Sequence, residues 1–587
     1  VHRGDCGAYW EDGVGSTAKA TTLNRQTQQI LPAGETAAAL ASIFEPRNRY
    51  PAQDFWNAWR NVMFYDEHTW GAHNSISQPG RQFVERQWEI KENYATRANL
   101  DARNLLARAN NRLAQTIEVD GSSIITFNWQ NRARTAPVEI EIGSGEQLVD
   151  LANDQVVPMD VYFERDGWRK IRFAAANVPP MGYKAYSIRG LKADAHQPNE
   201  KISGETIENS FYRLTVDKQT GALTSLFDKS ANRELADAKS PYKLNEYLYV
   251  SGGEGSLILN CTFGTAPANL QVETPASAEI VENVKTPLGQ RIVVLAKSKN
   301  TPRIRSEYLL HDKIKRVDIV NTIEKNETRA KEAVYFAFPF AAEKPGLEYQ
   351  IQNGWCRPND DQMPGACREW FTPQNLVHVS DGSFSVAWST PDAPLVTLTD
   401  INRGKWLAHL PIANGHVYSY ALNNYWFTNY RAEQGGTFVF RYSITSGREL
   451  SREDLAHFDE DTRTPVFAYP HLSSFSAAIA QSGRPMPAAG GSFLTLDAPN
   501  LEIVTLKEAE DGDGFILRFR EIAGRSGKAQ LRFPVFQVRE AHLCNGVEEN
   551  KQKLVTTADA VTVPYKPNAF TTVRLKTERP AQQTAAK

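Results

Sequence analysis

The stretch FVFRYSI, residues 438–444, places a large apolar side chain at every second position. A period of two is the repeat of a β-strand that buries one face. Similar short runs follow one another along the chain with turn residues between them: VEIEI (138–142), WRKIRF (168–173), RVDIV (316–320), FILRFR (515–520) and AQLRF (529–533). From Gly121 onward, the pattern therefore predicts antiparallel β-sandwiches.

Upstream of these runs, residues 36–116 carry the spacing of amphipathic helices. The run ETAAALASIFEP begins with acidic Glu35 and ends before Pro46, as helix termini do. A second run starts near Pro51, and a third begins at Arg81 with an apolar stripe about nine turns long. The stripe consists of Val84, Trp88, Ala95, Ala98, Ala102, Leu105, Ala109 and Leu113. Three helices joined by loops predict a small bundle.

The chain has 587 residues, and single hydrophobic cores stop growing at roughly 250–300 residues, so several domains are expected. Residues 1–35 are rich in Gly, Thr, Ser and Asn, which predicts loops leading into a short helix. The predicted parts are a front segment 1–35, a three-helix bundle 36–116, a small β-sandwich domain 117–190, a large β-sandwich domain 200–500, a C-terminal β domain 501–578 and a disordered tail 579–587.

Composition and charge exclude two classes of partner. The chain is 41% hydrophobic and 23% charged, with a net charge of −2, and its Lys and Arg residues are spread rather than clustered. Nucleic-acid binding needs a basic face, so no nucleic-acid partner is expected. No apolar run approaches the ~20 residues that a membrane span requires, so no membrane span is expected.

The five cysteines contain no C-x-x-C motif, which argues against a thiolate zinc cage or a redox pair. Cys356 and Cys367 lie near each other in a polar loop, where one disulfide and two free thiols are both open. The first residue is Val1, and no charged segment followed by an apolar one opens the chain, so a processed or truncated product is expected. The compartment is not fixed, although a secreted or periplasmic protein is favoured over a cytoplasmic one.

The segment FYDEHTWGAHNS, residues 64–75, places His68 beside Glu67 at the expected end of a helix. It is not H-E-x-x-H, because the second histidine follows at the fifth position, away from the helix face of the first. A histidine hydrogen-bonded to local carbonyls, a zinc ligand and a sugar contact therefore all remain open.

Two further segments combine polar and aromatic side chains. GDCGAYWEDG, residues 4–13, gathers Asp5, Glu11 and Asp12 in a Gly-rich loop with Tyr9 and Trp10. Acids beside aromatic walls suit glycoside hydrolysis, and a solvated acidic loop is the alternative. LNNYWFTNY, residues 422–430, interleaves amide and aromatic side chains, which suits a carbohydrate-binding wall and equally a twisted β-loop or a sandwich core.

Taken in order, these segments resemble glycoside hydrolase family 38, the α-mannosidases. The resemblance also rests on FNWQNRART, VPPMGYKAYSI and IENSFYRLTVDKQTGALTSLFDK, and it extends over nearly the whole chain. It implies an N-terminal α/β barrel, a three-helix bundle and a C-terminal β-sandwich region, together with a retaining mechanism and a zinc ion. The expected fold class is therefore multidomain α+β: a C-terminal remnant of the barrel in residues 1–35, the bundle, then large antiparallel β-sandwich domains.

The resemblance also implies roles for individual residues. Asp5, which lies in a Gly-Asp segment like that of the family, is the expected acid/base carboxylate, with Asp12 as the second choice. His68 occupies the place of a family zinc ligand, although its two neighbours differ from the family pattern. The expected sugar-binding residues are Trp10, Asn424, Trp426 and Asn429.

The other zinc ligands and the nucleophilic carboxylate are expected upstream of Val1. The sequence thus predicts a zinc-assisted, retaining, α-mannosidase-like glycoside hydrolase for mannose-containing oligosaccharides, whose catalysis needs residues upstream of this chain. The alternative is a non-catalytic, β-rich carbohydrate-binding or scaffolding protein. Linkage preference, natural glycan and oligomeric state are not fixed by the sequence, and a homo-oligomer is left open.

Overall fold

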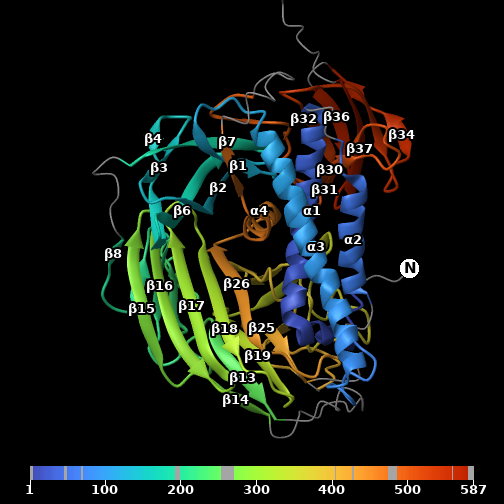
Figure 1. Cartoon of the computed structure of the whole chain (residues 1–587). Helices are drawn as coiled ribbons and strands as arrows, with labels where there is room; N and C mark the ends of the chain where they lie inside the picture. The colour runs from blue at the N-terminus through green and yellow to red at the C-terminus, as the bar shows by residue number, and fades with distance from the viewer. Residues whose placement is uncertain are drawn as a thin grey trace, which may run out of the picture. The chain divides into compact units, whose positions relative to one another are not determined.

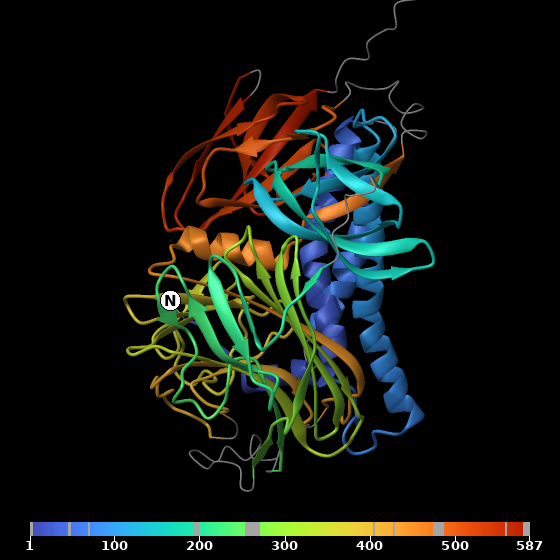
Figure 2. The ribbon, with the colours of Figure 1, turned by 90° about the vertical axis from the view of Figure 1, so that its left-hand side faces the viewer.

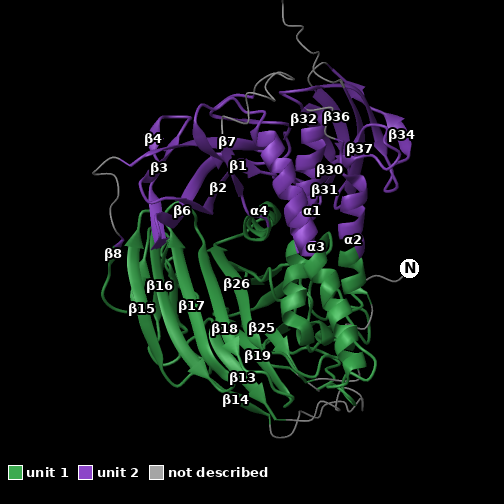
Figure 3. Cartoon of the chain, in the orientation of Figure 1, with its two compact units in different colours: residues 1–26, 61–97, 200–463 green, residues 27–60, 98–199, 464–587 purple. Residues whose placement is uncertain are grey.

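A computed structural model describes residues 4–44, 49–67, 71–191, 199–252, 270–402, 405–425, 429–472, 486–557 and 560–578. These residues form four α-helices, one 3-10 helix and seven antiparallel β-sheets, so the multidomain α+β class is confirmed (Figure 1). They gather into two compact units, shown in Figure 3. Unit 1 comprises residues 1–26, 61–97 and 200–463, and unit 2 comprises residues 27–60, 98–199 and 464–587.

Three sheets make up most of unit 1. The ten-stranded sheet runs in the order β21 (Gly354–Cys356), β20 (Gly346–Ile351), β22 (Leu376–Ser380), β23 (Ser385–Ser389), β26 (Gly436–Gly447), β18 (Val317–Lys325), β17 (Thr301–His311), β16 (Gly289–Ser298), β15 (Ala278–Thr286) and β8 (Glu200–Lys201). The five-stranded sheet runs β14 (Gln271–Glu273), β13 (Glu246–Ser251), β19 (Glu332–Phe340), β25 (Gly415–Asn423) and β24 (Val396–Leu398). The four-stranded sheet runs β12 (Arg233–Glu234), β11 (Leu223–Asp228), β10 (Tyr212–Val216) and β9 (Thr206–Glu208).

One hydrophobic core in unit 1 takes side chains from all three sheets. Leu214 of β10, Phe336 of β19 and Tyr442 of β26 all belong to it, and each is at most 1% exposed. The rings of Phe336 and Tyr442 lie 5.7 Å apart between centroids, so the five-stranded and ten-stranded sheets pack face to face. Figures 1 and 2 show the yellow-green strands β15 to β18 of the larger sheet side by side.

Unit 2 contains the other four sheets. The largest runs β27 (Phe467–Leu472), β1 (Ser122–Asn128), β7 (Gly182–Gly190), β3 (Glu146–Asp150) and β4 (Gln155–Val156), with β28 (Gly490–Ser492) also paired to β7. A three-stranded sheet runs β2 (Arg134–Gly143), β6 (Trp168–Val178) and β5 (Met159–Arg165). A four-stranded sheet runs β29 (Thr495–Leu496), β32 (Gly527–Arg532), β36 (Ala560–Tyr565) and β35 (Val555–Thr556). A five-stranded sheet runs β30 (Leu501–Glu508), β31 (Phe515–Glu521), β37 (Phe570–Glu578), β33 (Gln537–Cys544) and β34 (Asn550–Lys553).

The period-two runs lie in strands, as predicted. FVFRYSI belongs to β26, where Phe438, Phe440 and Tyr442 are buried and Val439 between them is 43% exposed. The remaining runs fall in β2, β6, β18, β31 and β32. Local alternation therefore identified these strands because one face of each is buried in a core.

One helix follows a predicted apolar stripe, and another helix was not predicted. α3 (Gln82–Ala114) follows the predicted apolar stripe, whose eight residues are all buried. α2 (Ala52–Asp66) ends inside the segment 64–75, two residues before His68. α4 (Arg452–Arg463), the orange helix of Figures 1 and 2, was not predicted. The three-helix bundle as a domain, and the six predicted domain ranges, stay predictions.

The short helix expected after residue 35 is wrong in length, because α1 (Ala18–Phe44) begins 17 residues earlier and continues through Pro32. Its first half buries Thr21 and Asn24, which are polar, so no apolar stripe marks the helix in the sequence. Both side chains make hydrogen bonds to α2. The hydroxyls of Thr21 and Tyr65 lie 2.8 Å apart, and the Asn24 amide donates to Asp66 at 2.8 Å.

Cys356 and Cys367 are both buried free thiols, so they form no disulfide. Burial raises the pKa of each thiol, to about 11 for Cys356. Among the described residues, no helix is both long and apolar enough to cross a membrane. The predicted tail, residues 579–587, lies outside the described residues.

Candidate functional site

The predicted acid/base residue Asp5 is held by a loop of unit 1 that lies far along the chain. Its backbone N–H donates to the carbonyl of Asp361 at 2.7 Å, and its carbonyl accepts from the N–H of Met363 at 2.8 Å. The hydroxyl of Tyr349, on β20, donates to the Asp5 carboxylate at 2.7 Å. Asp5 remains partly exposed, so its carboxylate is fixed in direction while solvent reaches the residue.

The loop contains a second carboxylate, Glu11, for which the sequence predicted no role. It accepts hydrogen bonds from the Ala8 N–H and the Thr372 hydroxyl, both at 3.1 Å. Burial raises the pKa of Glu11 above its usual value, and the charge of Asp5 adds to that effect. The loop therefore holds two interacting carboxyls, and burial, which the sequence does not reveal, singles out Glu11.

Asp12, the second choice for the acid, has a different environment. It is fully buried, and it accepts hydrogen bonds from the Tyr430 hydroxyl at 2.6 Å and from the Asn423 amide at 3.1 Å. A Cβ on Gly13 would lie 2.6 Å from the Tyr430 ring, so glycine is required for this close approach. Asp12 thus ties residues 10–13 to the segment after β25.

The predicted sugar-binding residues occupy varied surroundings. Trp10 is 46% exposed, and its carbonyl accepts a hydrogen bond from the Tyr430 hydroxyl at 3.0 Å. Asn424 is fully buried, and its amide donates to the carbonyl of Arg431 at 3.4 Å. The carbonyl of Asn429 accepts from the N–H of Ala72 at 3.1 Å. Trp426 lies outside the described residues.

Residues 423–425 and 429–431 therefore contact two predicted parts of the site, residues 10–13 and the segment just after His68. A Cβ on Gly71 would lie 2.3 Å from the carbonyl oxygen of Asn429, and the hydroxyl of Ser75 donates to the carbonyl of Tyr430 at 2.7 Å. The three segments meet within unit 1 although they are far apart in sequence. Whether they contact a sugar stays a prediction.

An aromatic group next to the loop was missed by sequence reasoning. The Tyr9 ring stacks on Trp406 with centroids 4.1 Å apart, and it meets the edge of Trp370 at 5.7 Å. Trp370 belongs to one hydrophobic cluster of unit 1, and Tyr9 and Trp406 pack against it. Tyr9 lies hundreds of residues before Trp370 and Trp406 in the chain, so no local pattern could have joined it to them.

The predicted zinc ligand His68 lies outside the described residues. Among the described residues, no group of three His, Cys, Asp or Glu side chains could hold a metal ion. A catalytic zinc needs about three protein ligands and an open position, so the described residues by themselves do not fit this metal. Zinc stays a prediction, and no step below depends on it.

Comparisons with known proteins bear on the β-domains that hold this site. The model described as "Glycosyl hydrolases family 38 C-terminal domain" matches residues 207–390, and "Glycosyl hydrolases family 38 C-terminal beta sandwich domain" matches residues 500–573. The chain therefore contains two C-terminal domains of glycosyl hydrolase family 38. The first match falls in unit 1 and the second in unit 2.

Two solved structures share the fold of this chain. A glycosyl hydrolase family 38 protein from Enterococcus faecalis has a TM-score of 0.71 at 14% identity, over 96% of this chain and 71% of its own. An alpha-mannosidase from Enterococcus faecalis V583 has a TM-score of 0.69 at 13% identity, over 98% of this chain and 69% of its own. Among curated proteins, no sequence matches the chain.

Replacing Tyr430 by phenylalanine is expected to lower the free energy of unfolding by about 1–3 kcal/mol. The change removes the hydroxyl that donates to Asp12 and leaves a buried carboxylate oxygen with one partner fewer. Urea denaturation measures the loss. Tyr162→Phe is the control, since that hydroxyl bonds to the exposed Glu139 and its removal should cost less than about 0.5 kcal/mol. Equal losses in the two variants would refute a structural role for the Tyr430–Asp12 contact.

Proposed function

We propose that the protein is a retaining glycoside hydrolase that cleaves α-linked mannose from mannose-containing glycans. The match of residues 207–390 and 500–573 to C-terminal domains of glycosyl hydrolase family 38 carries the proposal. The solved structures that share its fold include an alpha-mannosidase, which supports mannose as the sugar. The carboxylate pair at residues 5 and 11, beside exposed Trp10, supplies the acid and aromatic groups that glycoside hydrolysis uses.

Asp5 is the proposed acid/base. In the first step its carboxyl group gives a proton to the leaving glycosidic oxygen while a second carboxylate attacks the anomeric carbon. In the second step the Asp5 carboxylate takes a proton from the water that releases the sugar. Tyr349 holds one Asp5 oxygen, which leaves the other available for the proton. The attacking carboxylate is not assigned to a residue of this chain.

Asp12 takes no part in the proposed proton transfers. Its carboxylate is fully buried and already accepts hydrogen bonds from Tyr430 and Asn423, so its proposed role is to position the loop. The zinc ion remains part of the proposal, with His68 as one ligand. When bound, it would hold vicinal sugar hydroxyls of the mannose.

Hydrolysis of 4-nitrophenyl α-mannoside by the full-length protein tests the proposal. We expect at least a tenfold higher kcat/KM, about 1.4 kcal/mol, than for the α-glucoside or α-galactoside, because a site built for one hydroxyl pattern rejects others. Proton NMR during turnover should show the α-anomer of mannose first, as retention requires. No hydrolysis of any of the three, together with binding of mannose oligosaccharides, would favour the non-catalytic alternative.

A further inference from the structure

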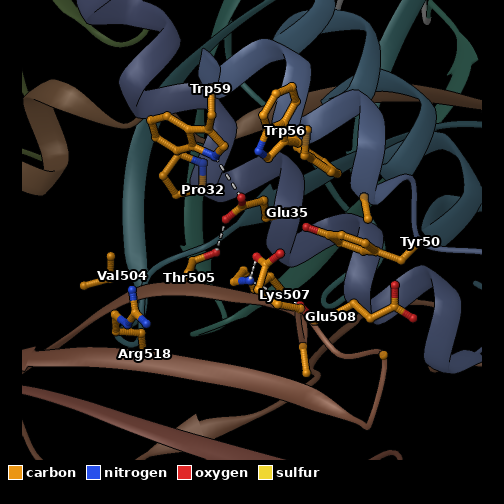
Figure 4. A pocket seen from close by; sticks show the side chains of 15 residues that line it. Pro32, Glu35, Tyr50, Trp56, Trp59, Val504, Thr505, Lys507, Glu508 and Arg518 are labelled. Carbon is orange, nitrogen blue, oxygen red and sulfur yellow. Dashed lines mark hydrogen bonds and ion pairs between the residues drawn. The ribbon is translucent and has the colours of Figure 1, made fainter. Parts of the chain in front are cut away.

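A pocket of about 430 Å³ lies in unit 2, and its lining includes none of the carboxylates discussed above (Figure 4). Its walls come from α1, α2, β30 and β31, and from Tyr50, which precedes α2. The volume falls within the range of roughly 300–1,000 Å³ that is typical of small-molecule sites. Every residue that lines it belongs to unit 2, so the pocket is complete within that unit.

A buried carboxylate, Glu35 of α1, lies in the wall of the pocket. The ring N–H of Trp59 donates to one of its oxygens at 2.8 Å, and the hydroxyl of Thr505 donates to the other at 2.7 Å. Burial raises the pKa of Glu35. The two donors fix both the carboxylate and the plane of the Trp59 ring, as Figure 4 shows. The pocket therefore has a rigid polar group and a rigid aromatic face before any ligand binds.

Further aromatic side chains line the pocket beside Glu35 and Trp59. Trp56 lines the pocket and is 53% exposed, although the guanidinium of Arg60 lies 5.1 Å from the centre of its ring. Tyr50 is partly buried, stacks on Phe55 at 5.2 Å, and points its hydroxyl toward the middle of the pocket in Figure 4. An exposed indole and a hydroxyl directed inward present an apolar face and a hydrogen-bonding group together.

The pocket wall carries charged side chains of both signs, and its lysine already has partners. Lys507 forms ion pairs with Glu510 at 2.5 Å and with Glu548 at 2.8 Å, while Glu508 and Arg518 also line the wall. An anionic ligand would meet the carboxylates, and a purely apolar ligand would leave these polar groups without contacts. A neutral ligand rich in hydroxyl groups meets neither obstacle, because carboxylates accept from hydroxyls and aromatic faces pack against C–H groups.

We infer that this pocket is a second carbohydrate-binding site, which takes one or two neutral sugar units of a glycan. Trp56 and Trp59 contact the ring faces, and the Tyr50 hydroxyl and Glu508 bind sugar hydroxyls. The inference goes beyond the proposed hydrolysis, because none of its residues belongs to the candidate functional site. Its role is to hold a polymeric glycan on unit 2 independently of cleavage.

Affinity electrophoresis of the full chain tests this inference. Native gels would contain α-mannan, galactomannan, xylan or mixed-linkage β-glucan, and a plain gel gives the reference mobility. We expect at least one polysaccharide to slow the wild-type chain. Trp56→Ala should weaken that retardation about five- to tenfold, the size of one lost aromatic contact. Tyr50→Phe, which keeps the ring and removes only the hydroxyl, should weaken it by a smaller factor.

Trp168→Ala is the matched control, because Trp168 is also an exposed tryptophan of unit 2, 58% exposed, and does not line the pocket. It should bind like wild type, and so should Asp5→Asn. No retardation of wild type in any gel would overturn the inference, as would equal losses in Trp56→Ala and Trp168→Ala. Loss in Asp5→Asn alone would assign the binding to the candidate functional site instead. Trp56→Ala should still cleave 4-nitrophenyl α-mannoside at the wild-type rate. Cleavage therefore tests the proposed hydrolysis, and retardation in the gel tests the pocket separately.

Discussion

Replacing Asp5 by alanine in the full-length protein is expected to lower kcat/KM for alkyl α-mannosides by about 10²- to 10⁴-fold, the range of general acid–base catalysis. An alkoxide leaves only if it receives a proton, and Asp5 is the partly exposed carboxylate, held by Tyr349, that is proposed to supply it. A 2,4-dinitrophenyl α-mannoside, whose leaving group needs no proton, should lose much less in the glycosylation step. Added azide should then speed release of the glycosyl enzyme, because an anion needs no general base.

Two variants make this result specific. Asp360→Ala changes an exposed carboxylate in the loop that holds Asp5, and it should leave both substrates within about twofold of wild type. Glu11→Gln tests the neighbouring carboxyl, whose pKa burial raises. If Glu11→Gln shows the selective loss and Asp5→Ala does not, Glu11 is the acid. Unchanged rates in both variants would remove this loop from the mechanism.

Replacing Lys325 by methionine is expected to lower the free energy of unfolding by about 3–5 kcal/mol, the cost of breaking a buried ion pair from one side. Lys325 of β18 and Glu332 of β19 form an ion pair in unit 1, and both side chains are at most 1% exposed. The Tyr249 hydroxyl and the Asn300 amide also donate to Glu332. Without the ammonium group, a carboxylate would stay buried and uncompensated in this network.

Urea denaturation of the variants measures this effect. Arg303→Met on β17 is the control, because its partner Glu324 is exposed. Exposed ion pairs contribute less than about 1 kcal/mol to the free energy of unfolding, so this variant should lose no more than that. The double variant Lys325→Met with Glu332→Gln should recover at least half of the loss, since the uncompensated charge is gone. A single-variant loss no larger than that of the control would contradict the assigned role of the pair. The backbone carbonyl of Glu332 also accepts from the Asn424 N–H at 2.8 Å, so the pair supports the segment near the candidate site.

The strands were predictable because their signal is local. A strand with one face in a core must alternate apolar and polar side chains, and the six period-two runs lie in strands for that reason. The stripe of α3 was predictable for the same reason, because its buried face is apolar. The first half of α1 was not predictable. Its buried face carries Thr21 and Asn24, whose burial depends on partners supplied by α2.

The sequence by itself also supplied the order of segments that pointed to glycosyl hydrolase family 38, and it proposed Asp5. It treated Asp5, Glu11 and Asp12 as one acidic loop. Only the tertiary structure separated them, because burial and hydrogen bonding differ at each one. Asp12 is enclosed by Tyr430 and Asn423, Glu11 is desolvated, and Asp5 stays partly exposed. Contacts between segments hundreds of residues apart decide those environments, and no pattern within one segment can encode them.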